Sequence, residues 1–84
     1  MQTEKSFRGI SQRLARHYLG NLGGEVVDDD RVEGDDWVAT LSSQKVNPVG
    51  SFQLTEVTVS FEGDAETLEP LVEQFSQKAM RAGG

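Results

Sequence analysis

The stretch FQLTEVTVSF, residues 52–61, is the clearest β-strand in this sequence of 84 residues. Successive side chains of a strand point to opposite faces, so its apolar positions can be assigned to one side of a sheet. This face carries Thr55, Val57, Val59 and Phe61. Phe52 and Leu54 have the opposite parity, which predicts either a β-bulge or an end of the sheet that is covered on both faces. We expect the strand to span residues 52–62.

Two further strands are expected before it. Residues 24–32 begin with a short apolar stretch and continue into the acidic run Asp28-Asp29-Asp30, and residues 37–43 alternate with Trp37, Ala39 and Leu41 on one face. A Gly-Asp turn signal at residues 34–35 lies between them, so we predict an antiparallel hairpin with acids at its tip. Residues 47–50, Asn-Pro-Val-Gly, are predicted to form a loop because proline and glycine both interrupt regular pairing.

A helix is predicted at each end of the chain. The first spans residues 6–22 and is expected to start at the N-cap Ser6 and to end at Gly23-Gly24. Its apolar stripe has three- and four-residue spacing and comprises Phe7, Ile10, Leu14, Tyr18 and Leu22. The second helix spans residues 65–82, with Asp64 as N-cap. Pro70 is expected in its first turn, where a missing N–H is harmless, so residues 65–68 form a separate turn. Its buried stripe comprises Leu68, Leu71, Val72, Phe75 and Ala79.

The expected fold is therefore α+β in a single domain over residues 1–84, with the order α-β-β-β-α. One apolar stripe on each helix and one apolar face on the sheet predict a two-layer sandwich. In this sandwich both helices cover one face of an antiparallel three-stranded sheet. The other face, with Val38, Thr40, Thr58 and Ser60, is expected to be solvated or open to a partner. The sheet would keep free edges, so a homodimer is an alternative to a monomer.

Acidic residues dominate the charge balance. Asp and Glu number 14 against 8 Lys and Arg, which leaves a net charge of −6, and only three residues are lysines: Lys5, Lys45 and Lys78. This composition is typical of halophilic proteins, and an ordinary acidic protein of a low-salt organism is the alternative. Nucleic-acid binding is not expected, because it depends on neutralising phosphates. No apolar run is long enough for a membrane span and no cysteine is present, so we expect a cytoplasmic protein without disulfides.

The excess of carboxylates predicts that salt stabilises the fold. Like charges repel one another in dilute buffer, and salt shortens the Debye length to about 10 Å at 0.1 M. We expect the thermal midpoint of unfolding to rise with added KCl or NaCl across the molar range. Differential scanning calorimetry at constant pH measures this midpoint. A midpoint independent of salt would contradict the halophilic interpretation.

The sequence offers little for catalysis. His17 is its single histidine and lies at the edge of the polar face of the first predicted helix, where a solvated side chain is expected. No nucleophile motif, dinucleotide fingerprint or phosphate-binding loop is present, so neither catalytic residues nor a cofactor are predicted. The acidic run also fails as a calcium loop that starts at Asp28, because the sixth position is Glu33 and the twelfth is Ala39. We therefore predict no metal site.

Two groups of residues are candidate sites. Lys5, Arg8, Arg13 and Arg16 are basic residues of the first predicted helix, which could dock an acidic partner or a phosphate group or simply be solvated. The C-terminal Gly83-Gly84 resembles the tail of sulfur carriers and ubiquitin-like modifiers, whose terminal carboxylate is adenylated after the chain threads a narrow channel. Glycine is also common just after a helix, so a stop signal is the alternative explanation.

The second half of the chain resembles a known family over three stretches: GSFQLTEV at residues 50–57, FEGD at 61–64 and KAMR at 78–81. They are similar to a small C-terminal domain of archaeal proteins related to MoaD, the sulfur-carrier subunit of molybdopterin synthase. In those proteins the domain follows a β-grasp carrier domain, and stand-alone versions occur in salt-loving archaea. The resemblance implies an accessory role close to molybdenum-cofactor (molybdopterin) synthesis or sulfur transfer.

Three functions follow as hypotheses. The first is a small non-enzymatic accessory or interaction domain that binds a protein partner. The second is a carrier or modifier that is activated at Gly84, although the β-grasp order ββαβ differs from the order expected here. The third is a small-ligand binder that uses the open face of the sheet.

Overall fold

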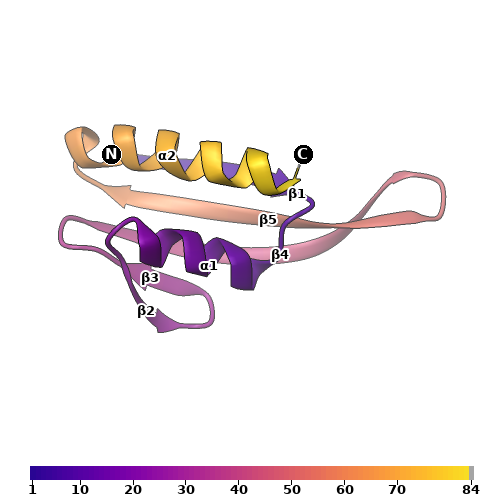
Figure 1. The fold of residues 1–84 in the computed structure, drawn as a ribbon, viewed down its shortest axis with the longest axis horizontal. Coiled ribbons are helices and arrows are strands. Elements are labelled where there is room, and N and C mark those ends of the chain that lie inside the picture. The colour runs from indigo at the N-terminus through magenta and orange to yellow at the C-terminus, as the bar shows by residue number, and fades with distance from the viewer. Residues whose placement is uncertain (84) are drawn as a thin grey trace.

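The computed structural model describes the backbone of residues 1–83 and the side chains of this range except those of residues 48, 82 and 83. Five strands and two helices follow one another along the chain (Figure 1). They are β1 (Gln2–Arg8), α1 (Gln12–Asn21), β2 (Glu25–Asp28), β3 (Arg31–Glu33), β4 (Trp37–Val49), β5 (Phe52–Gly63) and α2 (Ala65–Gly83).

All five strands form one antiparallel sheet with the order β1-β5-β4-β3-β2. The first strand of the chain therefore pairs with the last one, and β1 and β2 are the two edges. Both helices lie on the same face of the sheet and run in opposite directions (Figure 1). Helix α2 covers β1 and β5, and helix α1 covers β2, β3 and β4. The fold is α+β, and the prediction of a three-stranded sheet is wrong.

The N-terminal residues account for part of this difference. The predicted helix begins at residue 6, but residues 2–8 form β1, which pairs with β5 from Gln2–Glu62 to Arg8–Glu56. Phe7 and Ile10 have helical spacing, yet Phe7 contributes to the core from a strand and Ile10 from the connection to α1. Ser11, not Ser6, is the N-cap of this helix, because its Oγ accepts a hydrogen bond from the N–H of Leu14 at 3.0 Å. Pairing along a whole strand outweighs the weak preference for a helix that contains glycine.

The acidic region accounts for the other additional strand. The single hairpin expected from residues 24–43 is two hairpins, because the chain turns at residues 29–30 and again at 34–36. β4 also runs further than predicted, through residues 47–49, and the tight turn follows at Gly50-Ser51 with a positive φ of 53° at Gly50. The register shifts between Val46 and Val49, where β4 has one residue more than β5. This bulge lies in β4, so it does not change the parity of β5, and Phe52 lies exposed at the end of the hairpin.

Helix α2 is continuous from Ala65 to Gly83. The separate turn predicted for residues 65–68 does not form, and Pro70 lies inside the helix rather than in its first turn. Pro70 is exposed. The predicted stripe is correct, because Leu68, Leu71, Phe75 and Ala79 are buried and Val72 is partly buried.

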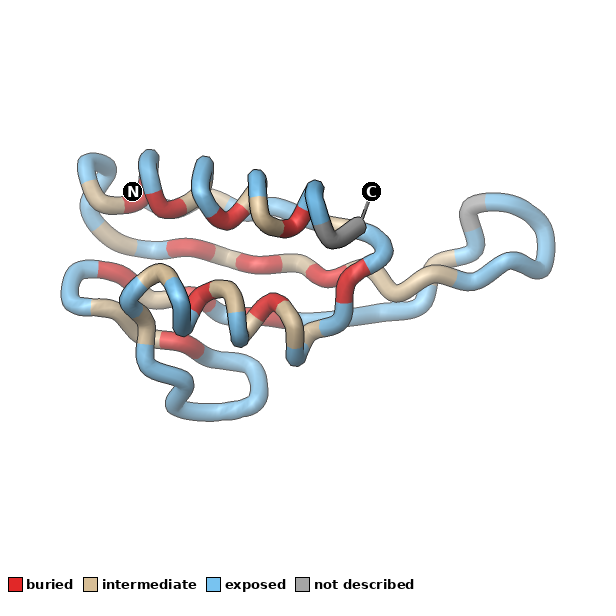
Figure 2. The backbone as a smooth tube through the Cα atoms, viewed as in Figure 1, coloured by how far each residue is buried: buried red, intermediate tan, exposed pale blue. Residues whose placement is uncertain are grey.

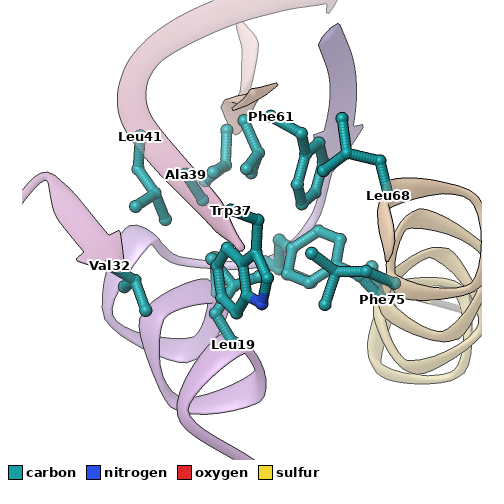
Figure 3. Packing of buried hydrophobic residues seen from close by; sticks show 14 residues of the cluster. Leu19, Val32, Trp37, Ala39, Leu41, Phe61, Leu68 and Phe75 are labelled. Atoms are coloured by element: carbon teal, nitrogen blue, oxygen red, sulfur yellow. The ribbon is translucent and has the colours of Figure 1, made fainter. Parts of the chain in front are cut away.

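The core lies between the sheet and the two helices. The sheet contributes the predicted alternating residues, which are Trp37, Ala39, Leu41, Val57, Val59 and Phe61. Figure 3 shows that Phe75 of α2 and Leu19 of α1 project toward these side chains from opposite sides. The tube coloured by burial shows that the buried segments stop well before the tip of the β4–β5 hairpin, which extends beyond both helices (Figure 2). At this tip Val49 and Phe52 are 74% and 59% exposed.

Candidate functional site

The structure separates the four basic residues that the sequence suggested as one docking face. Lys5 and Arg8 belong to β1, and their side chains leave it on opposite faces because strand residues alternate. Arg13 and Arg16 belong to α1. The four residues therefore do not form the polar face of one helix, and docking of a partner by them stays a prediction.

Two of these arginines have defined partners inside the domain. Arg16 Nη1 donates to the backbone carbonyl of Asp29 at 2.6 Å, and Gln12 Nε2 donates to the same oxygen at 2.9 Å. These bonds tie α1 to the turn between β2 and β3. On the open face of the sheet, Arg8 Nε donates to Glu56 Oε2 at 3.0 Å, and Gln44 Nε2 donates to Glu56 Oε1 at 3.2 Å. The hydrogen bonds from Arg8 and Gln44 lower the pKa of the Glu56 carboxyl.

Arg13 lies beside an open depression of about 430 Å³ that Ser11, Leu14 and His17 also line. A guanidinium and an imidazole, four residues apart on α1, therefore line the same depression. The arrangement suits an anionic group, but the start of a helix alone does not define a ligand. Of the four basic residues that were predicted to form a docking face, only Arg13 lines this depression.

The open face of the sheet is polar. Its middle carries a row of hydroxyls from three neighbouring strands, Ser6, Thr58 and Ser42, in which Ser6 Oγ and Thr58 Oγ1 are 2.9 Å apart. The row toward the end at Gly63 carries Glu62 and Glu33 with Val38 between them. These groups are solvated hydrogen-bonding positions rather than an apolar binding patch, and a small-molecule ligand on this face stays a prediction.

The C-terminal tail is only partly inside the described residues. Helix α2 includes Gly83, and Gly84 lies outside the described range. The backbone of Gly83 thus continues a helix. The role of Gly83-Gly84 as a carrier or conjugation site stays a prediction.

A further surface, which the sequence did not suggest, lies between β1 and α2. A depression of about 280 Å³ follows the edge of the sheet there. Thr3 and Lys5 line it from β1, and Leu68 and Val72 line it from α2. We call this surface the β1–α2 groove. Residues near the start of the chain thus meet residues in its last quarter, and no local pattern could reveal this.

The strand beside the groove has hydrogen-bonding groups that face outward. Paired residues of an antiparallel ladder alternate between those that exchange backbone hydrogen bonds and those that do not. The N–H of Gly63 donates to the carbonyl of Met1, and the N–H of Gly9 donates to the carbonyl of Thr55, both at 3.1 Å. The odd-numbered residues of β1 therefore bond to β5. The N–H and C=O groups of the even-numbered residues point away from the sheet: Gln2, Glu4, Ser6 and Arg8.

Within residues 1–83, no other strand pairs with this edge of β1. The described part of the chain also contains no cluster of three or more His, Cys, Asp or Glu side chains suited to a metal ion, and no described helix is long and apolar enough to cross a membrane.

Fold and surface together describe a small α+β domain with a free strand edge next to a groove. Comparison with known proteins gives the family: the model of the archaeal MoaD-like protein matches residues 3–84. The chain belongs to this family, as the resemblance in its second half suggested. No curated protein is significantly similar to the chain.

Proposed function

We propose that the protein is an interaction domain that binds a segment of a partner protein as an added strand along β1. The observation that carries this proposal is the row of outward-facing backbone groups on β1 directly beside the β1–α2 groove. In strand addition, backbone hydrogen bonds supply affinity, and pockets for alternate side chains supply specificity. The groove supplies such a pocket.

The two edges of the sheet are not equivalent for this purpose. β2 has only four residues, all exposed, and the acidic turn follows it directly. Short edges with charged residues are a common way to prevent strand pairing. β1 has seven residues, and the β1–α2 groove lies beside it, so an added strand there would pair along a longer edge and meet a pocket for its side chains. β1 is the edge that suits a partner.

An accessory role near molybdenum-cofactor synthesis or sulfur transfer fits this activity. Membership of the archaeal MoaD-like family supports the connection. In this proposal the protein is non-enzymatic and acts by binding a partner protein.

The competing function is a sulfur carrier or modifier that is activated at Gly84, which the family name favours. Against it, the chain approaches Gly83 as a helix, whereas a threading tail must be extended. Intact-mass spectrometry of the protein from its native host separates the two functions. A terminal thiocarboxylate, or Gly84 joined to lysines of other proteins, would establish the carrier and refute the interaction domain as its main role.

Ser6→Pro is expected to abolish partner binding without unfolding the domain. Ser6 has one of the outward N–H groups of β1, so proline removes a hydrogen bond to the added strand and none to β5. Affinity capture from cells of the native host, with the tagged wild type and variant side by side, measures the loss. Circular dichroism monitors the fold.

Two controls make this experiment specific. Ser6→Ala removes the hydroxyl that contacts Thr58 but keeps the N–H, so capture is expected to persist. Arg13→Glu with Arg16→Glu tests the basic helix instead. If this pair abolishes capture and Ser6→Pro leaves it unchanged, the partner docks on α1 and the proposal is wrong.

A further inference from the structure

The β1–α2 groove has an acidic rim. Glu69 and Glu73 lie four residues apart on α2, which places them on one side of the helix, and both line the groove. Among the described residues the ion pairs are Arg8–Glu56 and Arg31–Glu33, so neither rim carboxylate has a basic partner within 4 Å. Both glutamates are exposed. Lys5 of β1 also lines the groove, so two carboxylates face one ammonium group there, and the groove keeps a net negative charge on a protein with a net charge of −6.

The floor below this rim is apolar. Leu68 is fully buried and Val72 is half-buried, and both line the groove together with Thr3 of β1. Every second side chain of a strand added to β1 would point to the side of α2, because strand residues alternate. Long basic side chains suit this arrangement best: their methylene stems can cover apolar floor residues while the charged ends reach the rim.

We propose that the segment bound at β1 is an extended basic strand of a partner protein, with Lys or Arg at alternate positions facing the groove. This inference rests on the proposed function and adds the chemistry of the occupant. The outward backbone groups of β1 hold the strand, and Glu69 and Glu73 select its charge. Complementary charge at such a rim gives specificity and a faster association rate.

A second copy of the chain fits less well. Its own β1 offers Thr3, Lys5 and Phe7 on this face, which is one basic group for two glutamates. It is nevertheless an outcome that the test must separate, since two edge strands can pair.

Two designed peptides test the inference. Each has about nine residues, enough to span β1. One alternates threonine with lysine and the other alternates threonine with glutamate, and both carry a fluorescent label for anisotropy. At about 0.1 M salt, where the screening length is about 10 Å, we expect the lysine peptide to bind with a Kd about tenfold lower or better. The preference should shrink as salt is added.

Charge variants locate the effect. Glu69→Gln with Glu73→Gln is expected to remove the preference for the lysine peptide. Glu25→Gln with Asp28→Asn removes the same amount of charge from β2, at the opposite edge of the sheet. This variant is expected to retain most of the preference for the lysine peptide. Protection of the Glu4 and Ser6 amides from hydrogen exchange upon addition of the lysine peptide is the matching structural readout.

The possible failures are distinguishable. If Ser6→Pro abolishes binding but both peptides bind equally, strand addition stands and the basic occupant is wrong. If Ser6→Pro changes no binding, strand addition itself is wrong. If sedimentation shows a dimer that Ser6→Pro dissociates and neither peptide binds, the occupant is a second copy, which also overturns the inference.

Discussion

Replacing Phe75 with alanine is expected to destabilise the protein by about 3–5 kcal/mol, enough to unfold much of it. Phe75 is fully buried, and its ring contacts three aromatic rings on three different elements. The centroid distances are 5.3 Å to Phe7 of β1, 5.7 Å to Phe61 of β5 and 6.4 Å to Tyr18 of α1. Truncation therefore leaves a cavity where both helices meet the sheet.

Thermal unfolding followed by circular dichroism measures the loss. In a domain of this size each kcal/mol lowers the midpoint by roughly 4–8 °C. Phe52→Ala is the matched control, because the same truncation at a side chain that is 59% exposed should change stability by less than about 0.5 kcal/mol. Equal losses for the two variants would mean that Phe75 is not the centre of the core.

Gly34→Ala is expected to destabilise the fold by about 1–3 kcal/mol through overpacking at Trp37. A Cβ at Gly34 would overlap the indole ring of Trp37, which is only 7% exposed and has little room to move. A Cβ at Gly24 would lie 2.7 Å from the same ring and 2.9 Å from the carbonyl oxygen of Leu19. The indole thus packs closely against the backbone at Gly24 and at Gly34, and only glycine leaves room for it there.

A double-mutant cycle tests this explanation. In a Trp37→Leu background the ring is absent, so Gly34→Ala should cost clearly less than in the wild type. Gly20→Ala is the control, since no atom lies within 4 Å of the added Cβ and the position is helical, where alanine is favoured over glycine. Urea denaturation gives the free energies of unfolding. An identical cost of Gly34→Ala in both backgrounds would refute the clash with Trp37.

The sequence predicted the elements that have long, regular patterns. Strand β5, the alternating residues of β4 and the stripe of α2 bury the side chains that their spacing indicates. It failed at residues 2–8, because Phe7 and Ile10 continue the spacing of α1 and conceal the alternation of a short strand. It also divided the acidic region incorrectly, since three-residue strands such as β3 are too short to show a period.

The candidate site was less predictable than the fold. The four basic residues are neighbours in the sequence, but the chain reverses direction between β1 and α1 and separates them. The groove shows the reverse. Thr3 and Lys5 are far from Val72 in the sequence, but the fold places them along one depression. A signal for it exists in the strand at residues 52–62: it is the clearest and longest strand that the sequence predicts with regular alternation, and edge strands are usually short, which favours a second partner strand on its other side.

Taken alone, the sequence determined the buried stripes of β4, β5 and α2 and that the fold is α+β with an acidic surface, because burial follows from local periodicity and charge from composition. In α1 it missed Ala15 and Leu19, which are the buried residues of that helix. The tertiary structure determined the five-stranded order, the free edge of β1 and the acidic rim of Glu69 and Glu73 beside it. These features depend on which distant segments pair. Pairing is set by backbone hydrogen bonds and core packing across the whole domain, to which short stretches of sequence contribute no separate pattern.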